Sequence, residues 1–200
     1  MNRRKQFETT LPRTLDAIKD LSAEVCILDW SSTDGLKPVE HPQVKWKRVS
    51  GHKFYYPSKC KNEAHRMGIG EYLVNLDADN WVTSAWLDKV LPNLDPMAVQ
   101  WSGHSGCWGR IVIHRELFKR VGGYDEGMTG YGWQDSDLVL RAQALGAKII
   151  ETGNDGFLIH HDDLRNANRG SRAGFSATNR LNQKRSAQRI ALGKFDWRTK

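Results

Sequence analysis

Two carboxylates separated by one residue follow an apolar stretch of the chain. Residues 72–76 are typical of a buried strand, and Asp77 and Asp79 come directly after it. Carboxylates are costly where a strand leaves a protein core, unless a positive group meets them. Such a pair can share one hard divalent cation, because Mg²⁺ and Mn²⁺ prefer oxygen ligands and often bridge to substrate phosphates. It can also divide a cation and sugar hydroxyls between its two members, or be an ordinary polar strand end.

The flanking elements decide what else lies near this pair. Strands are expected at residues 24–30, 44–49, 71–76, 97–103, 109–115, 147–152 and 156–161, and helices at 7–21, 57–69, 82–91, 115–123 and 134–146. This alternation predicts an α/β fold with a mixed, mostly parallel central sheet flanked by helices. Ligands of such sheets bind outside the carboxyl ends of the strands. Asp29, near the end of the first expected strand, should therefore lie on the same edge as Asp77.

The composition is that of one globular domain with a basic end. The chain has 200 residues, of which 39% are hydrophobic and 26% charged, and we expect neither a membrane span nor a signal peptide. Three widely spaced cysteines argue against a disulfide framework and favour a cytoplasmic location. We expect residues 1–165 to form the domain and 166–200 to form a basic tail. The tail is either solvated and partly helical, or a contact surface for a membrane periphery, a polyanion or a partner.

The charge balance leaves one further class of protein open. A formal net charge of +7 fits a basic nucleic-acid-binding module as well as an enzyme with anionic substrates. No zinc finger, RRM or comparable module is visible in the sequence, so nucleic acid is not the expected partner.

Three segments in order resemble the GT-A glycosyltransferases, which use nucleotide sugars and carry an aspartate-x-aspartate motif. The segments are ILDWSSTDG (27–35), KCKNEAHRMGIGEYLVNLDADN (59–80) and GGYDEGMTGYGWQDSDLVLRA (122–142). The third is similar to the acceptor-side segment of β-1,4-galactosyltransferases, chondroitin polymerases and polypeptide N-acetylgalactosaminyltransferases. The resemblance runs from about residue 3 to about residue 170. It implies a Rossmann-like nucleotide-diphospho-sugar transferase fold, in which the family's first strand is absent or vestigial here.

The resemblance also implies a donor site and a metal site. The implied donor-binding residues are Asp29, Asn62 and Asp77, and the implied metal ligands are Asp79 and one of His160 and His161. Asp29 would lie near the nucleotide base and ribose, Asn62 would support the donor site, and Asp77 would face the ribose or donor sugar. The expected cofactor is Mn²⁺ or Mg²⁺, and the sequence does not decide between the two histidines.

On the acceptor side, the resemblance implies a catalytic base and a sugar-binding loop. The implied acceptor-binding residues are Tyr131, Gly132, Trp133 and Gln134, whereas Trp101 and Trp108 are expected in the core and not at the site. Gln134 replaces the glutamate of the family and cannot be a base. Asp135 is the implied base, which takes the proton of the acceptor hydroxyl as it attacks the donor sugar. Asp137 is expected to lie at a different angle around the same helix, and both aspartates could instead be acidic groups at a helix N-terminus.

The function implied is a metal-dependent, inverting transfer of a hexosyl or N-acetylhexosaminyl group. The donor would be a nucleotide-diphospho-sugar, in first place a UDP-sugar, and the acceptor a hydroxyl group of a glycan or another molecule, as in polysaccharide biosynthesis. The alternatives are a non-catalytic GT-A relative or fragment, a nucleotidyltransferase, and the basic nucleic-acid-binding module.

Overall fold

The computed structural model describes residues 1–104, 106–156 and 174–199. Its strands are β1 (Val25–Trp30), β2 (Val44–Val49), β3 (Tyr72–Asn75), β4 (Ala98–Trp101), β5 (Ile111–His114) and β6 (Lys148–Glu151). Its helices are α1 (Arg4–Ile18), α2 (Pro57–Met67), α3 (Ser84–Val90), the 3₁₀ turn η1 (Leu91–Asn93), α4 (Arg115–Arg120), α5 (Gln134–Ala144) and α7 (Phe175–Ala191). Each element expected within the described residues is present, with ends shifted by a few residues. The strand expected at 156–161 lies, apart from its first residue, outside the described residues.

The described strands form two sheets. Strands β1 and β2 pair in parallel, with Val25 opposite Val44. The other sheet has the order β3-β5-β4-β6, in which β5 is antiparallel to both neighbours and β4 is parallel to β6. The α/β class and the mixed sheet are confirmed. The sheet is not mostly parallel, because the short connection between β4 and β5 is of the kind that joins antiparallel neighbours.

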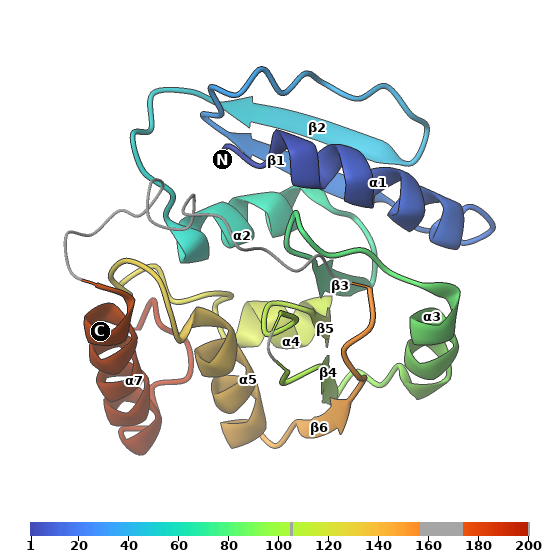
Figure 1. Ribbon diagram of the computed structural model, residues 1–200. Helices are drawn as coiled ribbons and strands as arrows, with labels where there is room; N and C mark the ends of the chain where they lie inside the picture. The colour runs from blue at the N-terminus through green and yellow to red at the C-terminus, as the bar shows by residue number, and fades with distance from the viewer. Residues whose placement is uncertain (105, 157–173, 200) are drawn as a thin grey trace.

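Helices cover both faces of the four-stranded sheet (Figure 1). Strand β5 shows the alternation that this requires, because successive side chains of a strand point to opposite faces. Ile111 and Ile113 pack with Leu138 of α5 in one buried cluster. Val112 packs with Trp86 of α3 in the other. The two apolar clusters fix the sheet, and with it the turn that follows β3.

The edges of β1 and β3 that point toward each other are not paired. Among the described strands, β1 pairs only with β2, and β3 pairs only with β5. Helix α2 contacts both β1 and β3 and so connects the two sheets. A cavity occupies the space between the two strands.

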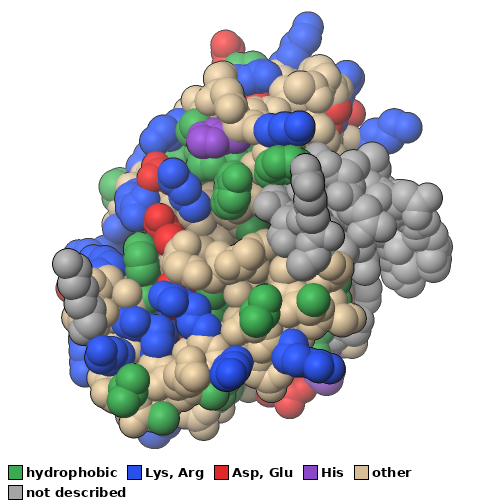
Figure 2. Space-filling view, turned by 90° about the vertical axis from the view of Figure 1, so that its left-hand side faces the viewer, with side chains coloured by type: hydrophobic (Ala, Val, Ile, Leu, Met, Phe, Trp, Pro, Cys, Tyr) green, Lys and Arg blue, Asp and Glu red, His purple; other side chains and the backbone are tan. Residues whose placement is uncertain are grey.

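The last helix is part of the packed structure. Helix α7 lies against α5 (Figure 1) and buries a polar stripe of Thr178, Asn182 and Ser186, spaced four residues apart. This part of the expected tail is therefore helical but not simply solvated. The domain boundary at residue 165 stays a prediction, since residues 157–173 are outside the described residues. Seen from the side of α7, Lys and Arg side chains are interspersed with hydrophobic and neutral ones (Figure 2). No helix in the described part of the chain has the length and apolar character needed to cross a membrane.

Candidate active site

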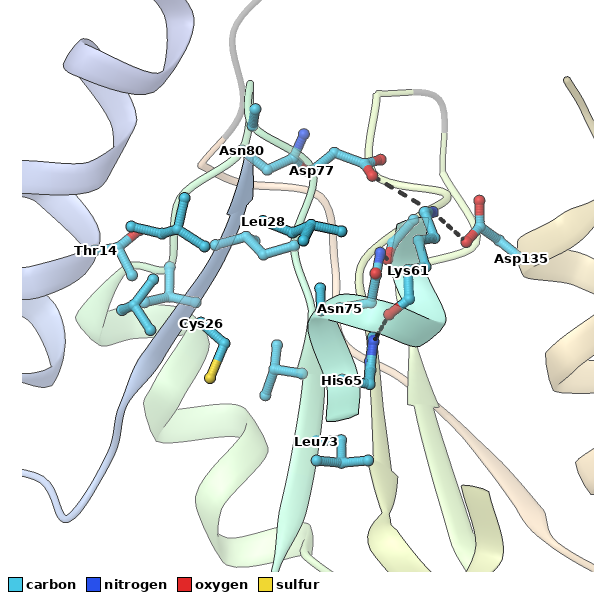
Figure 3. Close-up of a pocket in the computed structure, with 18 of the residues that line it drawn as sticks. Thr14, Cys26, Leu28, Lys61, His65, Leu73, Asn75, Asp77, Asn80 and Asp135 are labelled. Atoms are coloured by element: carbon cyan, nitrogen blue, oxygen red, sulfur yellow. Dashed lines mark hydrogen bonds and ion pairs between the residues drawn. The ribbon is translucent and has the colours of Figure 1, made fainter. Parts of the chain in front are cut away.

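A cavity of about 2030 Å³ lies between β1 and β3 and extends to the carboxyl ends of both strands. Between the two strands its walls are apolar and include Cys26 and Leu28 of β1 and Leu73 of β3 (Figure 3). Its upper end in Figure 3 is charged and contains Asp77 and Asp135. The polar groups thus meet where the sequence analysis expected ligands to bind.

The turn after β3 presents the two carboxylates of the aspartate pair. Asp77 lies against Gly109, where an added Cβ atom would come within 2.2 Å of Asp77 Oδ2, so only glycine leaves this carboxylate room. Asn75 donates a hydrogen bond of 2.5 Å to the carbonyl group of Gly109 and holds it there. Asp79 is half-buried at the cavity and accepts a hydrogen bond of 2.8 Å from Asn80. Both carboxylates can therefore offer oxygen atoms to a ligand in the cavity.

Lys61 of α2 connects Asp77 with Asp135 at the start of α5 (Figure 3). Its Nζ atom lies 2.6 Å from Asp135 Oδ1 and 3.4 Å from Asp77 Oδ1, and its side chain is only 9% exposed. The ring of Tyr124 lies 5.3 Å from the same nitrogen. One buried cation thus joins the expected donor side to the expected base. Lys61 was not predicted from the sequence, because a lysine in a helix is ordinarily solvated. The one signal near it was the neighbouring Asn62, which the resemblance implied as a donor-site residue.

The charges of this cluster influence one another. Burial alone would lower the pKa of Lys61, but the carboxylates of Asp135 and Asp77 outweigh burial and hold that pKa well above its usual value. Lys61 is therefore positively charged. Burial raises the pKa of Asp135, Lys61 opposes that shift, and the charge of Asp77 adds to it. A raised pKa makes a carboxylate a stronger base, which suits proton abstraction near neutral pH.

Asp29 lies at the carboxyl end of β1, lines the cavity and is 1% exposed. Its Oδ1 atom accepts a hydrogen bond of 3.0 Å from the backbone of Ser32. Its Oδ2 atom lies 3.3 Å from Arg48 Nη1 but accepts no hydrogen bond from any described residue. A buried carboxylate oxygen without a hydrogen bond is costly, so this atom is suited to accept one from a ligand.

Asn62 does not line the cavity. It is buried, and its Nδ2 atom donates to the carbonyl group of Tyr124 and to Glu126, both at 2.9 Å. Its Oδ1 atom accepts from the backbone nitrogen of Tyr124 at 2.8 Å. Asn62 therefore fixes the start of the acceptor-side segment, and a support of the donor site by Asn62 would be indirect.

The expected acceptor loop closes one side of the cavity. The cavity lining includes Tyr131, Gly132, Trp133 and Gln134. Gly132 has a φ of 112°, and a Cβ atom there would lie 2.7 Å from Asn179 Oδ1, so glycine is required. Gln134 uses its amide within the loop, accepting from Gly132 at 2.7 Å and donating to Gly130 at 3.0 Å. Tyr131 is 46% exposed and remains open to a ligand. Gln134 thus shapes the loop that presents Tyr131.

Helix α7 holds this loop from behind. Asn182 accepts a hydrogen bond from the backbone nitrogen of Thr129 at 2.9 Å and donates to the carbonyl groups of Thr129 and Gly132 at 3.0 and 2.8 Å. Arg185 forms an ion pair of 2.7 Å with Asp125, which is fully buried. The C-terminal helix therefore stabilises the acceptor side of the cavity.

Asp137 has a structural position that differs from that of Asp135. It is 1% exposed and accepts hydrogen bonds of 2.8 and 2.6 Å from Arg141, one turn along α5. Arg141 also donates to the carbonyl groups of Val121 and Gly123. Asp137 is absent from the described cavity lining, which agrees with the expectation that it lies at a different angle around the helix from Asp135.

The expected histidine ligands, His160 and His161, lie outside the described residues. Within residues 1–104, 106–156 and 174–199, no group of three or more His, Cys, Asp and Glu side chains could hold a metal ion. Gly156, just before the histidine segment, is fixed beside the aspartate turn, because the backbone nitrogen of Trp81 donates to its carbonyl group at 2.8 Å. The carboxylates of Asp77 and Asp79 provide the oxygen atoms that Mn²⁺ and Mg²⁺ prefer.

Trp108 was expected in the core together with Trp101. Instead, Trp108 is 48% exposed and lines the cavity. Trp101 also lines the cavity, is half-buried, and donates a hydrogen bond of 2.9 Å from its indole nitrogen to the carbonyl group of Trp108. The loop between β4 and β5 carries Trp108 to the surface, which hydrophobicity alone does not show. The cavity therefore offers an aromatic face that the sequence analysis missed.

Comparison with known proteins identifies the fold. Residues 93–162 match the family model described as the N-terminal domain of galactosyltransferase. Three solved structures align with the chain over most of its length, with TM-scores of 0.59, 0.64 and 0.60. The fold is that of the GT-A glycosyltransferases.

The structures that share this GT-A fold are distant in sequence. A mannosyltransferase from Pyrobaculum calidifontis, in complex with GDP-Man and Mn²⁺, is 18% identical, and the alignment covers 95% of this chain and 60% of that one. The catalytic domain of Drosophila β1,4-galactosyltransferase 7 with xylobiose is 12% identical, with coverage of 92% and 76%. A mutant of that enzyme with manganese, UDP-Gal and xylobiose is also 12% identical, with coverage of 89% and 75%. No curated protein sequence matches this chain.

Proposed function

We propose that this chain transfers a sugar from a nucleotide-diphospho-sugar, in first place a UDP-sugar, to a hydroxyl group of a glycan or another acceptor. The observation that carries the proposal is the cluster of Asp77, Lys61 and Asp135, which joins the two sides of a cavity at the carboxyl ends of the strands. The GT-A fold supports it, as do the nucleotide sugars, manganese and xylobiose bound by the proteins that share this fold.

In the proposed reaction, Asp135 is the general base. It accepts the proton of the acceptor hydroxyl, whose oxygen forms a bond to C1 of the donor sugar. The bond between C1 and the diphosphate oxygen breaks, and the nucleoside diphosphate leaves with its electron pair. A single displacement of this kind inverts the configuration at C1, and one base on the acceptor side suffices for it.

The donor would lie along the carboxyl ends of β1 and β3. The Oδ2 atom of Asp29 would accept a hydrogen bond from the base or ribose, and Asp77 would face the ribose or donor sugar. Asp79 and either His160 or His161 would hold Mn²⁺ or Mg²⁺. When bound, the cation would act as a Lewis acid that stabilises the charge of the leaving diphosphate.

The acceptor would enter beside the loop at 130–134. Tyr131 is exposed at the cavity and Trp108 offers a second aromatic face, and such faces suit the C–H surfaces of a sugar ring. A hexosyl or N-acetylhexosaminyl donor and a role in polysaccharide biosynthesis belong to the same proposal.

A screen of nucleotide sugars with Mn²⁺ tests this function. We expect release of a nucleoside diphosphate with one of the sugars, and we expect Asp79→Ala to abolish divalent-dependent donor binding while the melting temperature is kept. Asp88→Ala, at an exposed position of α3, is the matched control. Pyrophosphate as the product would instead identify a nucleotidyltransferase, and unchanged Mn²⁺ and UDP-sugar affinity in Asp79→Ala would refute the metal assignment.

A further inference from the structure

Lys61 stands out among the groups that the proposed reaction does not use. A lysine side chain is almost never buried unless it is paired. Lys61 is buried and is paired with two carboxylates, Asp77 after β3 and Asp135 at the start of α5. Its neighbour Lys59, on the same helix, is exposed. The position of Lys61 on the inner face of α2 is therefore what brings its charge into the cavity.

The geometry connects Lys61 to both halves of the chemistry. The shorter contact, 2.6 Å, is to Asp135, and the longer one, 3.4 Å, is to Asp77. The short contact fixes the direction of the Asp135 carboxylate, while Asn62, the next residue, fixes the backbone of Tyr124 at 2.8 Å. Two adjacent residues of α2 thus set the position of the acceptor-side segment relative to β3.

The same charge acts on any cation that enters the cavity. Asp77 precedes Asp79 by two residues in the turn after β3, so a divalent cation bound by these carboxylates would lie near the ammonium group, which is 3.4 Å from Asp77 Oδ1. Like charges repel at short distances, and more strongly where water is partly excluded than in bulk water. Lys61 also neutralises carboxylate charge that would otherwise attract the cation.

We propose that Lys61 is a positioning residue that holds Asp135 in place for the reaction and, by its charge, weakens the binding of the divalent cation. This inference rests on the proposed function. The positive charge of Lys61 then lowers the affinity for the cation, while its ion pair keeps Asp135 in position. A purely structural lysine would behave differently, because its loss would weaken metal binding and turnover together with stability.

Lys61→Met tests the inference, with Mn²⁺ titrated alone in the absence of donor and acceptor. We expect Mn²⁺ to bind the variant roughly 10-fold or more tightly than the unaltered chain, since a neighbouring positive charge is removed. We expect kcat to fall roughly 100-fold, as a displaced catalytic group causes, with a smaller change in donor KM. Lys59→Met is the control and should change neither quantity.

A second variant covers the case in which Lys61→Met does not fold. Lys61→Arg keeps the charge, so its Mn²⁺ affinity should stay within about 3-fold of the unaltered chain while a misplaced guanidinium group lowers kcat. Equal or weaker Mn²⁺ binding by folded Lys61→Met, or 10-fold tighter binding by Lys61→Arg, would overturn the inference. Failure of the unaltered chain itself to bind Mn²⁺ would instead refute the metal site of the proposed function, and the inference with it.

Discussion

Asp135 and Asp137 should respond in opposite ways to the same substitution. Asp135→Asn keeps the size of the side chain and a hydrogen-bond acceptor for Lys61, but it removes the proton acceptor of the proposed reaction. A positioned general base contributes roughly 10²–10⁴-fold to turnover. We therefore expect that loss in kcat, with donor and Mn²⁺ affinity nearly retained. The cost in stability should be small, about 1–2 kcal/mol, because Asp77 still lies 3.4 Å from the Lys61 ammonium group.

Asp137→Asn should instead destabilise the fold. Asp137 and Arg141 have side chains that are 1% and 0% exposed and lie 2.6 Å apart, so the substitution leaves a guanidinium group buried without its counter-charge. Loss of one member of a buried ion pair costs about 3–5 kcal/mol. The amide oxygen of the introduced asparagine can still accept a hydrogen bond from Arg141, so we expect a loss of stability at the lower end of this range. For a domain of this size, about 3 kcal/mol lowers the melting temperature by roughly 6–12 °C.

The two variants are compared by thermal melting and by single-turnover kinetics well below both melting temperatures. We expect Asp135→Asn to lose turnover with the smaller fall in melting temperature, roughly 2–8 °C for a loss of about 1–2 kcal/mol. Asp137→Asn should show the larger fall in melting temperature and keep most of its turnover. Near-normal turnover of Asp135→Asn would mean that the acceptor proton leaves by another route. Equal losses of turnover in both variants would mean that the first turn of α5 acts only as a structural unit.

Two further predictions concern α7 and α2. Asn182→Ala leaves the backbone groups of Thr129 and the carbonyl group of Gly132 without these hydrogen bonds, so stability should fall by about 1–3 kcal/mol and acceptor KM should rise, with donor affinity unchanged. Exposed Gln183→Ala is the control, and an unchanged acceptor KM in Asn182→Ala would contradict the role assigned to α7. Burial lowers the pKa of His65 to about 4, below its ordinary value in the unfolded chain. The unfolded state then binds the proton more readily, so stability is retained above about pH 6.5 and falls toward pH 4, by about 2 kcal/mol at pH 5 from this group. Denaturant unfolding should be measured at pH 5 and pH 7.5, and the difference in unfolding free energy between the two should be smaller in His65→Gln than in the unaltered chain. An equal difference in the two proteins would mean that other groups cause the loss of stability.

The fold could be predicted largely from local patterns in the sequence. The run VKWKRV is β2 without any shift of its ends, and Pro57 begins α2 as expected. The carboxylates at the ends of β1 and β3 were correctly placed at one cavity, because the edge at which parallel strands end follows from the order of the elements. The pairing of β3 with β5 did not follow from that order, since strand direction depends on contacts between distant segments.

The site could be predicted only where a residue type itself carries the chemistry. Asp135 was found as a carboxylate in a segment resembling a known one, and the structure places it at the cavity. Lys61 escaped notice because burial of a lysine depends on the helix face that meets the sheets. Trp108 was assigned to the core because apolar character predicts burial on average, whereas loop geometry decides single cases.

The unpaired edges of β1 and β3 bear on how the molecule opens. Among the described residues, no backbone hydrogen bond joins these two strands, and α2 contacts both of them. Proteins open in cooperative units of differing stability, so the α1–β1–β2 half and the four-stranded half can exchange their amide hydrogens at different rates. An extended segment hydrogen-bonded to both edges would merge the two sheets and make their exchange cooperative. Because α2 also carries Lys61, any change in the spacing of the two halves would be transmitted directly to the charged end of the cavity.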